Sequence, residues 1–271
     1  MQDASADLKA MIAAAEAAGE GLLKRFGQLA ALDVRTKAGP TDLVSIADEE
    51  AEHNVRSHLA RARPAYSFLG EEGGAQGGED TANVWVVDPL DGTTNFLFGA
   101  PLWGVTIAHV REGAPVAGVT YLPVLNEMYV AEQGKGAWLN GRRISVSKRA
   151  RLIESVLACG IPFADKPDHP LFVAEMSLLT PKVAGIRRTG AGAVDLAWVA
   201  AGRWDAYWER CIKAWDMGAG IVLVREAGGG ATGADGLPLD LHGGHVCVSN
   251  GAIHGDLIAQ LNEARRMEPS I

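Results

Sequence analysis

The chain has 271 residues, of which 48% are hydrophobic and 21% are charged, and its formal net charge is −8 at pH 7. This composition predicts a globular protein with a substantial core and argues against extensive disorder. The negative charge argues against a general nucleic-acid or anionic-membrane surface, so a bound metal would have to attract any anionic substrate.

The first half of the chain predicts two helices followed by a run of strands. Apolar residues at helical spacing predict a helix within residues 1–30, where acidic residues from the start argue against a signal peptide. A capping box at Ser45 predicts a second helix to about Ala62. Glycine-rich residues 73–78 predict a mobile loop, and Asn140-Gly141 predicts a tight turn. We expect strands at 66–69, 84–88, 103–111, 115–122, 126–132 and 143–147.

The second half, after a polar boundary near residues 148–153, predicts an alternation of strands and helices. Such alternation is typical of an α/β layer with helices on both faces of a sheet. No transmembrane run is evident, and Cys159, Cys211 and Cys247 lack metal or redox spacing, so we expect buried thiols in a reducing cytoplasm. We expect strands at 155–159, 183–188, 204–209 and 245–248, and helices at 168–179, 191–202, 215–227 and 252–266.

Two carboxylates, Asp88 and Asp91, follow an apolar run and precede Gly92. Carboxylates combined with a backbone carbonyl from a rigid turn suit Mg²⁺, which takes oxygen ligands in octahedral geometry. If a helix begins at Thr93, the N–H groups of Gly92 and Thr93 are free to bind an anion. The segment therefore predicts a cation site beside a phosphate site. A capping or turn role is the alternative for either aspartate alone.

The spacing of these aspartates distinguishes two kinds of phosphatase. Enzymes with a nucleophilic aspartate carry Asp-x-Asp-Gly-Thr at a strand end, where the first Asp takes the phosphoryl group and the second acts as acid and base. Here Asp88 and Asp91 are one residue further apart, and Pro89 follows the first. The spacing disfavours an aspartyl-phosphate and favours direct attack by a metal-activated water.

Two further acidic sites have a similar setting. Glu71 and Glu72 follow the apolar run at 66–69, and Asp216 lies in the first turn of the helix expected at 215–227. The alternatives are a solvated loop for one of the glutamates and complementation of the helix dipole for Asp216. Four converging carboxylates would repel one another and raise their own pKa values, so bound cations would be needed to keep them ionised at neutral pH.

Together these motifs resemble the inositol monophosphatase family of Mg²⁺-dependent, lithium-sensitive phosphomonoesterases, within the superfamily of fructose-1,6-bisphosphatase. The resemblance covers nearly the whole chain through residues 39–45, 70–72, 88–96 and 215–216. It implies an α/β fold (α+β layered), an α-β-α-β-α sandwich. Residues 1–150 would form an N-terminal α+β lobe and residues 151–271 a C-terminal α/β lobe, joined in one compact unit with the active site between them.

The resemblance also implies the metal and catalytic residues. Thr93 and Asp42 match family residues that orient or deprotonate the attacking water, and Glu71 is counted with them as catalytic. A turn role after Pro40 is the alternative for Asp42. Phosphate would rest on Gly92 and Thr93. Two or three Mg²⁺ ions would be held by Glu71, Asp88, the Leu90 carbonyl, Asp91 and Asp216.

Substrate contacts are expected from the second half. Glu209 matches a family carboxylate that accepts hydrogen bonds from inositol hydroxyls, which suits a group with several lone pairs; an edge-strand acid facing water is the alternative. Lys213 stands where the family often has His or another residue, and would either attract a second anionic group or point to solvent. The small residues that would pass close to the substrate ring, or simply begin a helix, are Gly190, Ala191 and Gly192.

The leading hypothesis is a Mg²⁺-dependent phosphomonoesterase acting on inositol 1-phosphate and related polyol phosphates. Relatives that hydrolyse histidinol phosphate, a sugar bisphosphate or a phosphorylated nucleotide are the first alternative. A regulatory protein that binds the transcription or RNA-processing machinery is the second. We further expect a cytoplasmic homodimer whose substrate is a small phosphate monoester, with no direct contact to nucleic acid or membrane.

Overall fold

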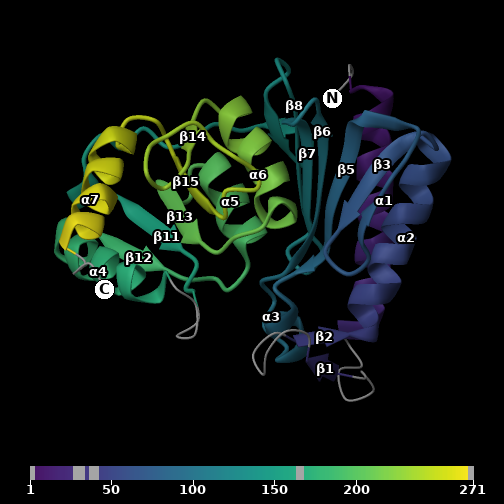
Figure 1. The fold of residues 1–271 in the computed structure, drawn as a ribbon, viewed down its shortest axis with the longest axis horizontal. Helices are drawn as coiled ribbons and strands as arrows, with labels where there is room; N and C mark the ends of the chain where they lie inside the picture. Colours follow the sequence, from purple (N-terminus) through teal and green to yellow (C-terminus); the bar gives the residue numbers. More distant parts are fainter. Residues whose placement is uncertain (1–3, 27–33, 37–42, 163–167, 268–271) are drawn as a thin grey trace.

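The computed structural model describes residues 4–26, 34–36, 43–162 and 168–267. Helices and sheets alternate in five layers, which confirms the α-β-α-β-α sandwich (Figure 1). A separate pair of short strands, β1 (Val34–Thr36) and β2 (Leu43–Ser45), lies at one end of the layers.

The larger sheet has eight strands. β3 and β5 pair in parallel, whereas the other neighbouring strands pair antiparallel. Its central strands are buried along most of their length because helices cover both faces of the sheet. The order is β10 (Arg142–Arg143), β9 (Ala137–Leu139), β8 (Glu127–Glu132), β7 (Ala114–Leu122), β6 (Gly104–Arg111), β5 (Asp80–Asp91), β3 (Tyr66–Gly70) and β4 (Gly74–Gln76).

Two helices, α1 (Ala6–Phe26) and α2 (Ile46–Ala62), cover the outer face of this sheet. Both begin and bury residues as the sequence predicts. Leu8, Met11 and Ala15 are buried at helical spacing in α1. At the start of α2 the Ser45 side chain accepts the N–H of Ala47, and the Asp48 carboxylate accepts the N–H of Ser45, which confirms the capping box.

The middle layer consists of α5 (Gly192–Ala200) and α6 (Ala214–Glu226), which pack between the two sheets. Glycines allow α6 to approach its neighbours closely. A Cβ atom at Gly118 of β7 would lie 2.5 Å from the carbonyl oxygen of Ala219, and one at Gly220 would lie 2.5 Å from the Cβ of Leu196. This close contact brings the first turn of α6 to the end of β5.

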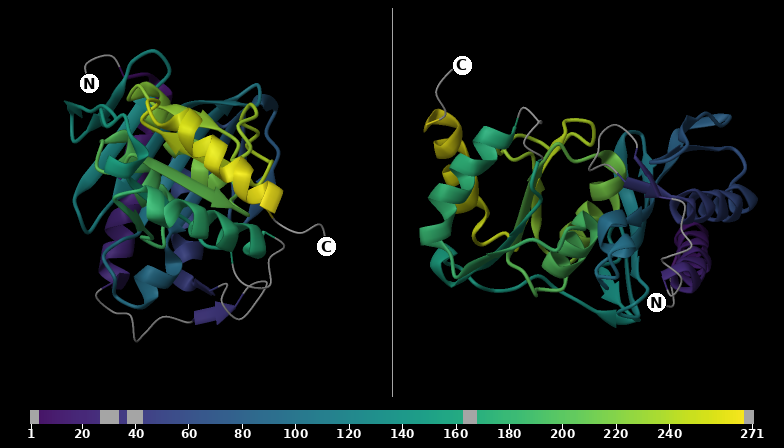
Figure 2. Two further views of the ribbon diagram at one scale, coloured as in Figure 1. Left: turned by 90° about the vertical axis from the view of Figure 1, so that its left-hand side faces the viewer. Right: turned by 90° about the horizontal axis from the view of Figure 1, so that it is seen from below.

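The smaller sheet has five strands, and α4 (His169–Leu179) and α7 (His254–Met267) cover its outer face (Figure 2). β12, β11 and β13 are parallel, whereas β13, β15 and β14 are antiparallel. The order is β12 (Gly185–Arg187), β11 (Val156–Cys159), β13 (Ala206–Arg210), β15 (His245–Ser249) and β14 (Gly230–Thr232). Short helices elsewhere are α3 (Thr93–Leu97) and the 3-10 helices Leu152–Glu154 and Thr180–Lys182.

The expected elements are present with ends shifted by a few residues, but some segments differ. The expected loop at 73–78 contains β4, which pairs with β3. The strand expected at 143–147 ends at Arg143, because the N–H of Val146 donates instead to the carbonyl of Ala227 after α6. The short strands β1, β2, β9 and β14 were not predicted.

The expected lobe boundary at residue 150 lies between the last strand of the larger sheet and the first strand of the smaller one, while α5 and α6 contact both sheets. The division into lobes stays a prediction.

Cys159 and Cys247 are buried, Cys211 is half-buried, and none of the three forms a disulfide. Within the described residues, no helix is both long enough and apolar enough to cross a bilayer.

Candidate active site

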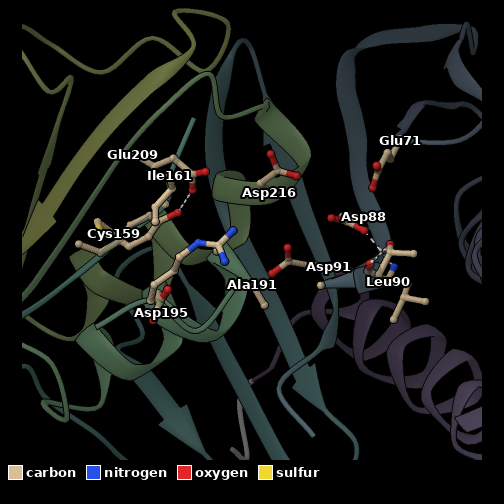
Figure 3. A pocket seen from close by; sticks show the side chains of 17 residues that line it. Glu71, Asp88, Leu90, Asp91, Cys159, Ile161, Ala191, Asp195, Glu209 and Asp216 are labelled. Atoms are coloured by element: carbon tan, nitrogen blue, oxygen red, sulfur yellow. Dashed lines mark hydrogen bonds between the residues drawn. The ribbon is translucent and has the colours of Figure 1, made fainter. Parts of the chain in front are cut away.

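A pocket of about 210 Å³ lies where the end of β5 meets α6 and the segment before α5 (Figure 3). Both halves of the chain contribute to it. The predicted metal ligands that line it are Glu71, Asp88, Leu90, Asp91 and Asp216. The predicted phosphate and substrate residues that line it are Gly92, Thr93, Gly190, Ala191, Gly192 and Glu209.

The end of β5 is shaped by its proline. The pairing of β5 with β6 shifts register between Asp88 and Asp91, where Pro89 has no N–H to donate. The N–H of Leu90 donates to Asp88 Oδ1 at 2.9 Å. Gly92 adopts the left-handed conformation with φ of 91°, and α3 begins at the next residue. The predicted helix start beside the aspartates is therefore confirmed.

The Asp91 carboxylate links the end of β5 to the start of α5. Its Oδ2 accepts the N–H of Ala193, in the first turn of α5, at 2.6 Å. Burial raises the pKa of Asp91 to about 7, and the charges of Glu71 and Asp195 add to the increase, although the N–H groups of Ala193 and Gly192 oppose it. The carboxylate is thus held at a helix N-terminus, which favours its ionised form.

The neighbouring carboxylates raise one another's pKa values. Burial first, and then the charges of Glu71, Asp91 and Asp216, raise the pKa of Asp88 well above its usual range. The pKa of Asp216 is raised in the same way, by burial and by the charges of Asp91 and Glu71. Side chains from β5, the segment after β3 and α6 therefore line one pocket, and their role as metal ligands stays a prediction.

The chemistry of this donor set fits Mg²⁺. Carboxylates and a backbone carbonyl are hard oxygen donors, and their mutual repulsion is the kind that a divalent cation relieves. Within the described ranges, no three acidic, thiol or imidazole side chains already converge on one point at metal-ligand distances.

Asp216 also serves its own helix. The N–H of Lys213 donates to Asp216 Oδ2 at 2.8 Å, so the carboxylate caps the first turn of α6. The helix-dipole alternative and the metal-site hypothesis are therefore compatible, since the other oxygen of the carboxylate is not needed for the cap. The Lys213 side chain itself is exposed and does not line the pocket.

Thr93 has a carboxylate partner that the sequence did not indicate. Its hydroxyl donates to Asp48 Oδ1 at 2.8 Å and lies 3.1 Å from the Leu90 carbonyl oxygen. Asp48 is buried, and its Oδ2 is occupied by Ser45. The predicted partner Asp42 lies outside the described residues. The only sequence signal for Asp48 was its place in the capping box, which indicates a structural role.

Glu52 of α2 supports the segment that carries Glu71. Its carboxylate accepts the N–H groups of Glu72 and Gly73, each at 2.8 Å. A Cβ atom at Gly70 would lie 2.3 Å from Glu52 Oε2, so only glycine permits this approach. The buried Glu52 carboxylate therefore positions the turn after β3, which makes it a positioning residue that sequence reasoning missed.

We expect Glu52→Gln to weaken Mg²⁺ binding about tenfold and to lower the free energy of unfolding by about 1–3 kcal/mol, because one N–H loses its charged acceptor. Calorimetric titration and denaturant unfolding measure the two effects. Glu50→Gln is the matched control, since Glu50 is exposed on the same helix in an ion pair with Arg25 and should change stability by less than about 1 kcal/mol. Equal Mg²⁺ affinity in both variants would contradict the positioning role.

Glu209 faces the pocket from β13, which lies between β11 and β15, so the edge-strand alternative is wrong. The Tyr207 hydroxyl donates to Glu209 Oε2, and a Cβ atom at Gly160 would overlap the carboxylate. Burial, followed by the charges of Asp216, Asp91 and Asp195, raises the pKa of Glu209 well above its usual range. Tyr207, Asp195 and Arg188 line the same end and were not predicted.

The layered fold, with carboxylates from both halves of the chain lining one pocket beside a helix start, defines the class: a protein of the fructose-1,6-bisphosphatase-like superfamily. A sequence profile of the inositol monophosphatase family matches residues 3–266, and the chain belongs to this family.

Several relatives are similar over nearly the whole chain. An inositol-1-monophosphatase of Mesorhizobium japonicum is 46% identical over 254 residues, covering 94% of this chain and 95% of the relative. A Nus factor SuhB of Pseudomonas aeruginosa is 40% identical over 247 residues, covering 90% of this chain and 91% of the relative. The solved structure of the extragenic suppressor protein suhB of Bartonella henselae has a TM-score of 0.92 at 43% identity, and the match covers 96% of this chain and 99% of that structure's chain. Family membership supports phosphatase activity.

Proposed function

We propose that the protein is a Mg²⁺-dependent phosphomonoesterase that hydrolyses inositol 1-phosphate and related polyol phosphates. The observation that carries this proposal is the meeting of Glu71, Asp88, Asp91 and Asp216 beside the N–H groups at the start of α3. Carboxylates placed next to anion-binding N–H groups suit a ligand that is negatively charged and is held through a cation.

The metal would be held by Glu71, Asp88, the Leu90 carbonyl, Asp91 and Asp216, as two or three ions. When bound, it supplies Lewis-acid stabilisation of the phosphoryl oxygens and the leaving group and increases the acidity of a nearby water. The chain itself holds the carboxylates in place through Ala193, Lys213 and Glu52.

The protein also supplies the groups that orient the reactants. Thr93 lines the pocket and its hydroxyl donates to Asp48, so Thr93 Oγ1 would accept a hydrogen bond from a water molecule. The N–H groups of Gly92 and Thr93 lie at the start of α3, where they bind phosphate oxygens. Asp48 accepts the hydroxyl proton of Thr93, whereas the resemblance assigns Asp42, together with Thr93, to orienting or deprotonating the attacking water.

The test is a phosphate-release assay with and without Mg²⁺ on inositol 1-phosphate, histidinol phosphate, fructose 1,6-bisphosphate and 3′-phosphoadenosine 5′-phosphate. We expect Mg²⁺-dependent release from inositol 1-phosphate, and inhibition by lithium at millimolar order. The pocket is smaller than the ~300–1,000 Å³ typical of sites for drug-sized ligands, which favours the smaller esters. Release that is independent of divalent ions would contradict the proposal.

Glu209 would accept hydrogen bonds from substrate hydroxyls. We expect Glu209→Gln to lower kcat/KM for inositol 1-phosphate roughly tenfold, because one acceptor oxygen becomes a donor. Hydrolysis of 4-nitrophenyl phosphate, which has no ring hydroxyls, should change much less. An equal loss on both esters would mean that Glu209 only supports the structure of the pocket.

A regulatory role is the second candidate, favoured by the 40% identity to a relative named Nus factor SuhB. Retention of RNA polymerase components by the immobilised protein, and by a variant without phosphatase activity, would support this role. Failure of both proteins to retain these components at the same salt concentration would count against it.

We also propose that the protein is a cytoplasmic homodimer. Analytical ultracentrifugation and light scattering measure the mass of the particle in solution and so test the dimer.

A further inference from the structure

The pocket has two chemically different ends (Figure 3). Glu71, Asp88 and Asp91 lie together at the end that would hold the metal and the phosphoryl group, with Asp216 beside them. Cys159, Ile161, Asp195 and Glu209 lie at the opposite end, with Ala191 in between. A phosphate ester bound at the first end therefore directs its alcohol portion toward the second.

Arg188 contributes the one basic side chain among the described residues that line this pocket. It follows directly after β12, and its charge acts on groups at the alcohol end: it lowers the pKa values of Glu209, Asp195 and Cys159, against the larger effect of burial on each. The guanidinium therefore lies near the groups that would surround the leaving alcohol.

The acids near Arg188 are already engaged by other donors. Asp195 accepts the Thr189 hydroxyl at 2.8 Å and the Trp204 indole N–H at 3.3 Å, and Glu209 accepts the Tyr207 hydroxyl. Within the described residues, Arg188 forms neither a hydrogen bond nor an ion pair, and its side chain is exposed. Other arginines differ: Arg203 pairs with Glu127, and Arg210 with Glu175. The donors of Arg188 are thus available to a ligand.

We propose that Arg188 recognises a second anionic group on the leaving alcohol, so that the preferred substrates are polyol or sugar phosphates that carry another phosphate or a carboxylate. A guanidinium offers only donors, and its planar fork matches the oxygens of phosphate or carboxylate. Glu209, which offers acceptors, would take the hydroxyls of the same molecule. This inference rests on the proposed phosphatase function and deepens it.

The test uses three esters with the same scissile bond: glucose 1-phosphate, glucose 1,6-bisphosphate and glucuronic acid 1-phosphate. Position 6 then carries a hydroxyl, a phosphate or a carboxylate, and release of the phosphate at position 1 is measured with Mg²⁺ present. We expect kcat/KM for one or both doubly anionic esters to exceed that for glucose 1-phosphate by roughly tenfold to a hundredfold. The two charged esters show which anion is preferred.

Arg188→Gln should reduce this preference to within about threefold while leaving glucose 1-phosphate nearly unchanged, and Arg188→Lys should restore part of it, because the ammonium keeps the charge without the fork. Arg187→Gln is the matched control, since Arg187 is an equally exposed neighbour that does not line the pocket. As a second readout, glucose 6-phosphate should inhibit inositol 1-phosphate hydrolysis more strongly than glucose does, and Arg188→Gln should remove the difference.

Different results overturn different claims. Equal turnover of the three esters by the wild-type protein, with no stronger inhibition by glucose 6-phosphate than by glucose, would overturn the second-anion site. An equal loss on all three esters in Arg188→Gln would show that Arg188 acts on the phosphoryl end instead. Absence of Mg²⁺-dependent release from every ester, inositol 1-phosphate included, would overturn the phosphatase function itself.

Discussion

Asp91→Asn and Asp216→Asn will each lower Mg²⁺-dependent phosphate release by roughly a thousandfold or more, because each removes a charged oxygen ligand from a site whose metal contributes several kcal/mol. The fold should persist. An asparagine oxygen at position 91 can still accept the N–H of Ala193, and one at position 216 can accept that of Lys213. Steady-state kinetics with circular dichroism of the same preparations measures both effects.

Asp256→Asn is the matched control for Asp216→Asn. Asp256 also lies in the first turn of a helix, α7, but it is exposed and far from the pocket lining. Its substitution should leave kcat/KM within a factor of two or three. Activity close to wild type in either Asp91→Asn or Asp216→Asn would show that these carboxylates are not metal ligands.

Mg²⁺ will bind more tightly as pH rises from about 6 to 8, by up to about tenfold per pH unit below the pKa of the group that titrates. Burial raises the pKa of Asp91 from 3.8 to about 7, so below pH 7 the metal must displace a proton from this carboxyl. Calorimetric titration in buffers with different ionisation enthalpies measures the released protons. Affinity that is constant across this pH range would contradict the proton displacement.

The same raised pKa fixes the sign of a stability effect in metal-free protein. The folded state holds the Asp91 proton up to pH about 7, whereas the unfolded chain loses it near pH 4, so this group destabilises the fold progressively as pH rises between these values. The free energy of unfolding of Asp91→Asn relative to wild type should therefore increase from pH 4 to 7 and then level off. Saturating Mg²⁺ should stabilise wild type more than the variant. If the free energy of unfolding of Asp91→Asn relative to wild type fell as pH rose, this result would contradict the raised pKa of Asp91.

Local sequence signals predicted several parts of the site correctly. Ser45 and Asp48 form the expected capping box, and the segment from Asp88 to Thr93 forms a strand end, a glycine turn and a helix start in that order. Each of these features depends on residues within a few positions of one another, through backbone sterics and short-range hydrogen bonds. The order of helices and strands was predictable for the same reason.

Partners far apart in the chain were not predictable in this way. Asp48 looked like a helix cap, yet its second oxygen accepts the hydroxyl of Thr93, 45 positions later. Glu52 was not singled out from the sequence, yet it is buried against the turn after β3. Lys213 was expected at the substrate and is outside the pocket, whereas Arg188 lines it.

The amino-acid sequence therefore specified which carboxylates, turns and helix starts exist, because the periodicity of apolar residues and the helix-capping residues are encoded over short stretches of chain. The packing of distant segments against one another specified which of these groups meet. Asp216 reaches Asp88 because α6 packs against Gly118 of β7 closely enough to exclude any side chain there. Such contacts depend on how side chains from distant segments fill the space between two sheets, and no local periodicity records that packing.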